Sequence, residues 1–277
     1  MVISKNHKVE GLILLNHGIF TFGSSAKQSY DRMIKLVTLA ENFLNKQKKL
    51  IKYNINNKKI NITDVQLCIR NLYHSFTNKR WIIKFNNKVE DVKFTNRKDL
   101  FNLFNKGPVT PDHVIRIKSE PLIIPNKHLS SSKMISNHIN AYIKKYKNYF
   151  KKYKKNITNS KIADPLPRII ILEGIGFLSI GLNKKEMQVS YDIFDAMKKV
   201  IIKANLVSKF KSINNTDIFK MEYWPLERAK LNNQNTKKFN GNVAVITGGA
   251  GKIGSAIANK FINENIEVIL IKYTSKY

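Results

Sequence analysis

The residues whose types and spacing most clearly indicate chemistry form a glycine-rich turn near the end of the chain. Gly249, Gly251 and Gly254 give the pattern G-x-G-x-x-G, between an apolar strand pattern at 243–246 and a helical pattern at 255–263. The first glycines permit a tight turn and a close approach of the backbone to a pyrophosphate, and the last lets the helix pack on the strand. The helix start adds N–H groups and the positive end of its dipole. The pattern therefore predicts a dinucleotide-binding turn.

A second apolar strand pattern at 266–271 completes a β-α-β unit. The cofactor-binding residues that the turn itself predicts are Thr247, Gly248, Gly249, Gly251, Lys252, Ile253 and Gly254.

This stretch resembles the start of a short-chain dehydrogenase/reductase, whose fingerprint begins with Thr-Gly. Lys252 stands where a glycine is usual, so the spacing is nearer the variant of the extended members. The resemblance implies NAD or NADP as the cofactor. Where the family usually places an acidic residue for the adenosine ribose, this chain has Lys272, a cation that would favour the 2′-phosphate of NADP. The family's catalytic Tyr-x-x-x-Lys does not occur in this sequence, so no catalytic residue is assigned.

The remainder of the chain resembles a second family. Gly11 to Gly23, followed by Tyr30 and Ala40-Glu41, looks like the C-terminal part of a class II aldolase/adducin domain. Further blocks resemble the bifunctional aldolase/short-chain dehydrogenase proteins, which are associated with rhamnulose-phosphate aldolase and lactaldehyde dehydrogenase activities. These blocks are Thr110-Pro111-Asp112-His113 with Arg116 and Lys118, Pro167-Arg168, Gly174-Ile175-Gly176, and Glu222-Tyr223-Trp224 with Leu226-Glu227 and Lys230-Leu231. Their order, ending in a nucleotide-binding start, matches that fusion.

The resemblance implies a zinc-dependent site, and His17 in an Asn-His-Gly turn matches one of the family's zinc ligands. In the family, zinc acts as a Lewis acid and stabilises the enediolate left when the carbon–carbon bond breaks. The family's other ligands, a His-x-His pair, and its acid/base glutamate lie upstream, and this sequence contains no His-x-His. We therefore expect His17 to belong to an incomplete metal site. The resemblance gives no role to His113, which is expected in a loop at 107–113 because two prolines interrupt that segment.

The expected fold class is α/β. Residues 1–231 are predicted to form the C-terminal part of a class II aldolase-like domain with a helical and strand extension, 232–240 a linker, and 241–277 the first, truncated βαβ unit of a Rossmann domain. Within the first part, apolar spacing predicts a strand–turn–strand at 11–22, helices at 26–46, 63–76 and 184–206, and strands at 81–85, 168–172 and 176–180.

Charge offers a competing interpretation. The chain has 277 residues and a formal charge of +30, which is typical of a nucleic-acid binder, but about 42 of its 49 basic residues are lysine. Lysine, asparagine and isoleucine share adenine- and thymine-rich codons, so genome composition can also produce this bias. In the most lysine-rich segment, Tyr142, Tyr146, Tyr149, Phe150 and Tyr153 fall on one face of a helix. A packed aromatic stripe with a solvated lysine face is therefore favoured over base stacking.

Other features limit the remaining function classes. No apolar run reaches the roughly 18–20 residues that span a bilayer, and the start of the sequence lacks the apolar core of a signal peptide. The single cysteine, Cys68, excludes an intrachain disulfide framework. A cytoplasmic protein without membrane partners is expected.

The resulting hypothesis is an internal piece of a bifunctional enzyme. It would combine zinc-dependent cleavage of a phosphorylated small-molecule substrate, similar to rhamnulose 1-phosphate, with NAD(P)-dependent aldehyde or alcohol oxidoreduction, and would be inactive alone. Separately encoded N- and C-terminal pieces are candidate partners, and a homo-oligomer is plausible for the intact enzyme. The alternatives are a basic nucleic-acid- or anion-binding protein and a truncated gene product without function.

Overall fold

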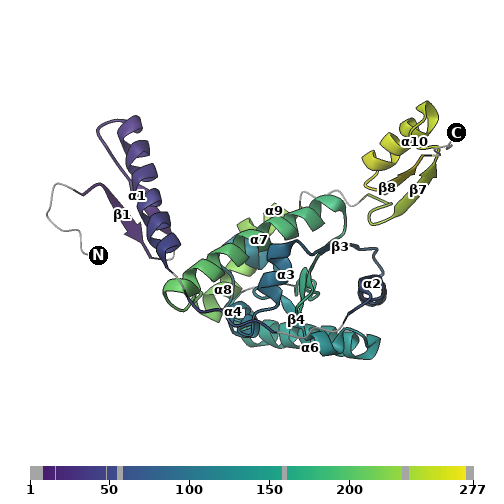
Figure 1. Ribbon diagram of the computed structural model, residues 1–277, viewed down its shortest axis with the longest axis horizontal. Helices are drawn as coiled ribbons and strands as arrows, with labels where there is room; N and C mark the ends of the chain where they lie inside the picture. Colours follow the sequence, from purple (N-terminus) through teal and green to yellow (C-terminus); the bar gives the residue numbers. More distant parts are fainter. Residues whose placement is uncertain are drawn as a thin grey trace.

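The computed structural model describes residues 9–15, 17–47, 49–54, 59–157, 161–232 and 237–272 (Figure 1). Its centre is a four-stranded sheet in the order β3-β6-β5-β4, in which β4 and β5 are parallel and the other pairs are antiparallel. The strands are β3 (Ile82–Asn86), β4 (Leu122–Ile124), β5 (Ile169–Leu172) and β6 (Gly176–Gly181). The expected α/β class is therefore observed.

Helices cover both faces of this sheet. On one face lie α2 (Ile62–Thr77) and α6 (Ser132–Tyr153), whose apolar residues pack with those of the sheet into one core. On the other face lie α3 (Val89–Thr95), α4 (Leu100–Phe104), α5 (Pro111–Ile117) and α7 (Lys184–Val207), which contribute to a second core. The central body is thus a three-layer arrangement with a separate core on each side of the sheet.

The strand β5 explains why both faces need cover. Side chains alternate across a strand, and all four residues of β5 are apolar. Ile170 and Leu172 point into the core formed with α2 and α6, whereas Ile169 and Ile171 point into the core formed with α7. All four side chains are fully buried, as expected for a strand with helices on both faces.

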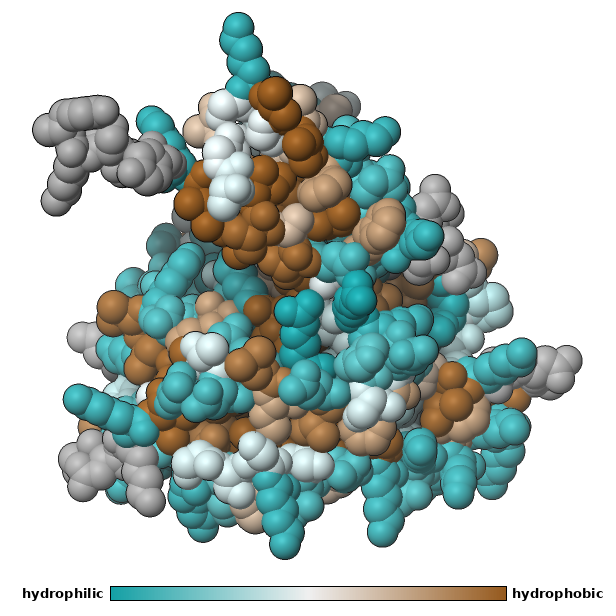
Figure 2. Space-filling view, turned by 90° about the vertical axis from the view of Figure 1, so that its right-hand side faces the viewer, coloured by the Kyte–Doolittle hydropathy of each residue, from teal (hydrophilic) through white to brown (hydrophobic). Residues whose placement is uncertain are grey.

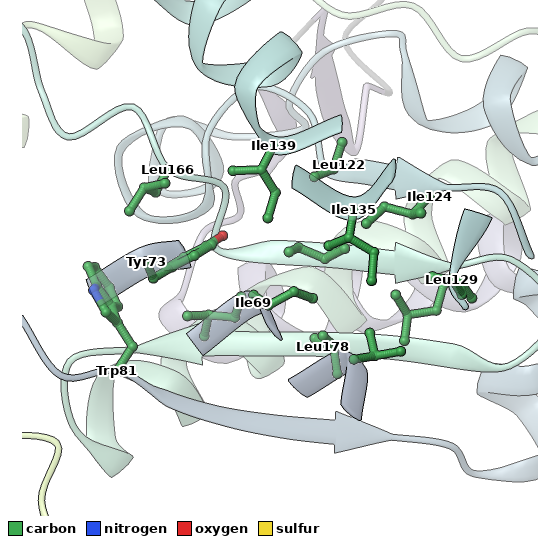
Figure 3. Packing of buried hydrophobic residues seen from close by; sticks show 14 of the residues in the cluster. Ile69, Tyr73, Trp81, Leu122, Ile124, Leu129, Ile135, Ile139, Leu166 and Leu178 are labelled. Atoms are coloured by element: carbon green, nitrogen blue, oxygen red, sulfur yellow. The ribbon is translucent and has the colours of Figure 1, made fainter. Parts of the chain in front are cut away.

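Aromatic and cationic side chains close one end of the first core, the end at which Figure 3 shows Tyr73 and Trp81. Tyr73 packs edge-on against Trp81, and its hydroxyl donates a hydrogen bond of 2.5 Å to the carbonyl of Pro167. The guanidinium of Arg168 lies 4.5 Å from the Trp81 ring centroid and pairs with Asp164 at 2.8 Å. The Pro167-Arg168 block therefore holds the edge of the core together.

The N-terminal unit is a hairpin followed by a helix. Strands β1 (Gly11–Leu14) and β2 (Gly18–Thr21) pair antiparallel, and α1 (Ala26–Lys46) begins at the cap Ser25, whose side chain accepts from the backbone N–H of Gln28. None of the residues of α1 is buried. This unit projects from the central body (Figure 1).

The C-terminal unit projects from the other end of the body (Figure 1). Strands β7 (Val243–Thr247) and β8 (Glu267–Ile271) are parallel and are joined by α10 (Lys252–Asn263), as the sequence predicts. The short helices α8 (Asn215–Glu222) and α9 (Pro225–Asn232) precede this unit, and two 3-10 turns occur at Asn126–His128 and Lys154–Asn156.

The predicted linker at 232–240 lies partly outside the described residues, at 233–236, and Asn232 ends α9. Just after it, Gly241 contacts the central body: Arg70 Nη2 donates a hydrogen bond of 2.9 Å to its carbonyl. Its φ of +77° and the 2.5 Å that would separate a Cβ from the Arg80 carbonyl oxygen both require glycine. The start of the C-terminal unit is thereby fixed to the middle of α2 and to the residues before β3.

Most of the predicted elements are confirmed, but the loop expected at 107–113 is wrong. Residues from Pro111 onward form α5, because proline fits the first position of a helix, where its missing N–H has no partner to bond. Thr110 and His113 form a capping box, in which His113 Nδ1 accepts from the Thr110 backbone N–H at 3.1 Å. His113 therefore lies in a helix and caps its start.

No helix in the described residues is both long and apolar enough to cross a membrane.

The His113 cap predicts a pH dependence of stability. Burial lowers the pKa of His113 below its usual value near 6.5, so the folded state favours the neutral ring that accepts from Thr110. This contribution to the free energy of unfolding is complete above about pH 6.5 and is lost as the pH falls below it. His113→Ala should cost about 1 kcal/mol at pH 8 in urea unfolding, and His113→Gln, which keeps an acceptor, should cost less and flatten the decline at low pH. An unchanged pH profile in His113→Gln would contradict this assignment.

Candidate functional site

The glycine-rich turn connects β7 to α10 at the carboxyl edge of the two-stranded sheet. Gly248 has a φ of +66°, and its carbonyl oxygen accepts from the N–H of Gly251 at 3.0 Å, which closes the turn. The N–H of Gly249 donates to the carbonyl of Ile271 at 3.3 Å and so ties the turn to β8. The turn is thus held by backbone hydrogen bonds.

Close packing requires glycine at position 254, and the neighbouring glycines of the turn are less constrained. A Cβ at Gly254 would lie 2.4 Å from the Gly248 carbonyl oxygen and 2.7 Å from Cα of Gly249, so only glycine lets the first turn of α10 rest on the loop. A Cβ at Gly249 would lie 2.7 Å from Leu270 Cδ2. At Gly251, a Cβ would meet the Gly248 carbonyl oxygen at 3.3 Å, which is a much milder contact.

The predicted cofactor-binding residues come together at this edge. Thr247 ends β7 and pairs in register with Ile271, so Lys272 follows at the same edge. The helix α10 begins at Lys252 after Gly251, which offers no side chain to cap it, and its first turn carries no acidic residue. The lysine charge at the N-terminus of α10 is repelled by the positive end of the helix dipole. A bound anion there would be stabilised by the lysine charge and by the dipole.

The described residues fit the phosphate part of a dinucleotide. The open space beside Gly248, where an added Cβ would meet no atom within 4 Å, the uncapped start of α10, and two lysines at one edge would together suit an anion. Thr247, Gly248, Gly249, Gly251, Lys252, Ile253, Gly254 and Lys272 would hold the group.

His17 does not join other metal ligands in the described residues. It lies exposed in the β1–β2 turn with its ring stacked on Phe20 at 5.3 Å between centroids. Among the described residues, no three His, Cys, Asp or Glu side chains are placed to hold a metal ion together. The described residues therefore do not by themselves fit a zinc ion.

A buried ion pair is the main feature to which sequence reasoning gave no role. Lys118 Nζ lies 3.4 Å from Glu222 Oε1 and donates to the Tyr146 hydroxyl at 3.2 Å, and both charged side chains are almost fully buried. The Tyr146 hydroxyl donates to Glu222 Oε1 at 2.6 Å, and the Tyr223 hydroxyl lies 2.9 Å from that of Tyr146. Burial lowers the pKa of Lys118, and the Glu222 carboxylate opposes this effect.

The backbone at Lys118 is strained. Its φ of 72° and ψ of 171° lie in a region that is essentially restricted to glycine. Such a conformation costs on the order of 1–3 kcal/mol and persists only where surrounding contacts impose it. The helix α5 ends at Ile117, and the next residue turns its side chain inward. The Lys118 ammonium then contacts Tyr146 and Glu222, and these contacts hold the strained backbone in place.

A signal for this cluster was present in the sequence: Lys118 and Glu222-Tyr223 belong to the blocks that resemble the bifunctional proteins. Their spacing of 104 residues, however, gave no reason to pair them.

The aromatic stripe of α6 is packed, as predicted. Tyr146 and Phe150 are buried against Phe219 and Tyr223 of the α8 segment, and Tyr149 and Tyr153 lie partly buried against the same cluster. Tyr146 and Phe150 are therefore not available to stack bases.

Comparison with known proteins identifies the central body. Residues 61–231, more than half of the chain, match the family described as "Aldolase class II, second domain". The chain belongs to this family. The matched residues of the aldolase second domain run from the cap of α2 into the last turn of α9 and include the whole central sheet.

A curated relative covers more than this domain. "Uncharacterized oxidoreductase YuxG" of Bacillus subtilis (strain 168) is 25% identical over 283 residues, which cover 97% of this chain and 40% of the relative. The chain thus spans about two fifths of that relative's length. No solved structure matches the chain.

The glycine turn predicts a position-specific response to alanine. Gly254→Ala must displace the loop, whereas Gly251→Ala, with its Cβ at 3.3 Å and a φ of −79°, requires a small adjustment only. Because cleavage tracks the opened population, trypsin should cut after Lys252 and Lys260 about tenfold faster in Gly254→Ala, equivalent to ~1.4 kcal/mol, and less than threefold faster in Gly251→Ala. Equal rates in the two variants would show that the loop does not pack on α10 as described.

The buried pair predicts non-additive stabilities. Lys118→Met leaves the Glu222 carboxylate buried without its cation and should lower the free energy of unfolding by about 3–5 kcal/mol. The double variant Lys118→Met/Glu222→Gln removes both charges and should recover most of that loss in urea unfolding. If the losses in unfolding free energy of Lys118→Met and of Glu222→Gln alone simply add in the double variant, Lys118 and Glu222 do not interact.

Proposed function

We propose that this chain is part of an enzyme that joins class II aldolase chemistry to NAD(P)-dependent oxidoreduction. The observation that carries the proposal is the order of the chain: the aldolase second domain lies between a turn that holds His17 and a glycine turn suited to phosphate. The relative that matches 97% of the chain is named an oxidoreductase, and this name supports the combination of aldolase and oxidoreductase units.

The aldolase half would cleave a sugar phosphate similar to rhamnulose 1-phosphate. Class II aldolases are typically zinc-dependent, and bound zinc supplies a Lewis acid for the substrate oxygens. We propose His17 as one ligand, with the remaining donors contributed by segments outside this chain. The excess of lysine over acidic residues would favour the approach of a phosphorylated substrate.

The oxidoreductase half would bind NAD or NADP at the β7–α10 turn of a Rossmann-type unit. The N–H groups at the start of α10 would hold the pyrophosphate, with Lys252 nearby, and Lys272 would contact the adenosine ribose end. A bound dinucleotide supplies hydride transfer, and the described residues contribute binding and orientation only.

Exposed apolar surfaces indicate that both terminal units need a partner. Figure 2 shows apolar residues gathered over the projecting C-terminal unit, where Val243, Val245, Ile269, Leu270 and Ile271 are exposed. In α1, Tyr30, Ile34, Val37 and Phe43 are exposed as well. Apolar area of this kind is typical of interfaces. We propose that these apolar surfaces are covered by separately encoded or adjoining segments of the same enzyme. An assembly of several copies and a cytoplasmic location fit this function.

An aldolase assay tests the proposal. The isolated chain with zinc and rhamnulose 1-phosphate should show no turnover above background. A mixture with an upstream polypeptide of the family that carries a His-x-His pair should release dihydroxyacetone phosphate, and His17→Ala should abolish that release while His74→Ala, a change at an exposed histidine, should not. Robust turnover by the isolated chain, or full activity of the His17→Ala mixture, would contradict the proposal.

A further inference from the structure

A basic cavity lies where the C-terminal unit meets the central body. Its volume is about 400 Å³, within the roughly 300–1,000 Å³ that is usual for small-molecule sites. One wall comes from the end of α2 and the residues before β3, and the other from the segment before β7. Its lining includes Lys79, Arg80, Lys237, Lys238, Asn240 and Asn242, and no carboxylate of the described residues lines it.

Contacts between the two walls set the shape of the cavity. The Arg80 guanidinium donates a hydrogen bond to the side-chain carbonyl of Asn242. Beside this bond, Gly241 lets the backbone before β7 approach the backbone of Arg80 closely. Lys184 Nζ also lies 3.7 Å from Glu267 Oε2 and joins the start of α7 to the start of β8. The cavity is therefore formed before any ligand binds, which lowers the entropic cost of binding.

The amide side chains of the lining are oriented as donors. Asn240 Oδ1 accepts from Asn265 Nδ2 at 3.0 Å, and Asn242 Oδ1 accepts from Arg80. Within the described part of the chain, the Nδ2 groups of Asn240 and Asn242 have no acceptor. Because an amide nitrogen can only donate, both groups suit a ligand that is rich in acceptor oxygens.

The cations of the lining are largely unmatched. Lys79, Arg80 and Lys238 have no carboxylate within ion-pair distance among the described residues. The fourth cation, Lys237, lies 3.9 Å from Glu264 and donates to the carbonyl of Asn263. A cleft lined by charges of one sign concentrates ions of the opposite sign. An anion with several charges would therefore offset the repulsion among these side chains.

The cavity is separate from the glycine turn. Asn242 directly precedes β7, whereas Gly248 directly follows it, so the two sites lie at opposite edges of the two-stranded sheet. The five residues of β7 span about 16 Å. A pyrophosphate held at the start of α10 would therefore leave this cavity free.

We propose that the cavity binds a small anion with two or three linked phosphoryl groups. Arg80 holds one phosphoryl group through its planar fork, and Lys79 and Lys238 contact the others. The amides of Asn240 and Asn242 donate to the phosphoryl oxygens. Linked phosphoryl groups bring several negative charges into a small volume, as the unmatched cations require. The inference needs neither aldolase activity nor dinucleotide binding at the glycine turn.

Isothermal titration calorimetry on the full chain, at physiological ionic strength and without divalent cations, tests the site. The probes are pyrophosphate, tripolyphosphate, ATP, orthophosphate and citrate. Pyrophosphate and tripolyphosphate should bind one to one and at least about tenfold more tightly than orthophosphate, which offers a single group to the fork and the lysines. Citrate, whose charge is similar to that of pyrophosphate, should bind about tenfold more weakly than pyrophosphate. Tighter binding of ATP than of tripolyphosphate would assign the phosphoryl groups to a nucleotide, and weaker binding to a free polyphosphate.

Two variants locate the binding. Arg80→Gln should raise the Kd for pyrophosphate about tenfold and Lys238→Gln about fivefold, because each removes charge-assisted hydrogen bonds to the anion. Lys260→Gln, at an exposed lysine of α10 that does not line the cavity, removes the same charge as Lys238→Gln and should bind as the parent does. Circular dichroism verifies that all three remain folded.

Three results would overturn the proposal. The first is that none of the probes with linked phosphoryl groups binds, and the second is that orthophosphate or citrate binds as tightly as pyrophosphate. The third is that Lys260→Gln weakens binding as much as Lys238→Gln, because the net charge of the chain would then account for the attraction.

Discussion

The burial of one strand on both of its faces is the constraint on which the structure depends. Ile169 to Leu172 can leave water only if helices lie on each side of the sheet, and α2 with α6 and α7 with α3 and α4 provide that cover. The ends of these helices then place the polar groups: α5 ends at Lys118, α6 presents its tyrosine face, and α8 ends at Glu222. The buried pair is therefore a consequence of how the sheet is covered.

The terminal units do not share this protection. Within the described residues, neither the hairpin with α1 nor the β7–α10–β8 unit has helices on both faces of its strands, and large apolar side chains of both are exposed. A two-stranded sheet with one helix cannot bury both faces. The family match at residues 61–231 covers the sheet that has helices on both faces and leaves out both terminal units. The boundaries of the aldolase second domain therefore agree with the division between the central body and the terminal units. The stable part of the chain and the parts expected to need partners are thus distinct.

Local sequence patterns predicted much of the fold. The helices at α1, α2 and α7, the hairpin, and the βαβ unit follow from apolar periodicity and glycine placement, which are local properties. The helix α5 was missed because proline at its first position resembles a loop signal, and His113 replaced the usual glutamate of a capping box. The Lys118–Glu222 pair was also missed: it joins residues 104 positions apart, and only the packed sheet brings them together. The sequence indicated the glycine turn because that site is contained in one short segment.

Native-state hydrogen exchange, measured by mass spectrometry on peptides, tests the central claim most directly. Amides of β5 and β6 should open only by global unfolding. Amides of α1 and of β7, α10 and β8 should open with free energies at least about 2 kcal/mol lower, because few buried contacts hold them. Uniform protection across all three regions of the isolated chain would contradict the claim that the doubly covered sheet of the aldolase second domain holds this structure together.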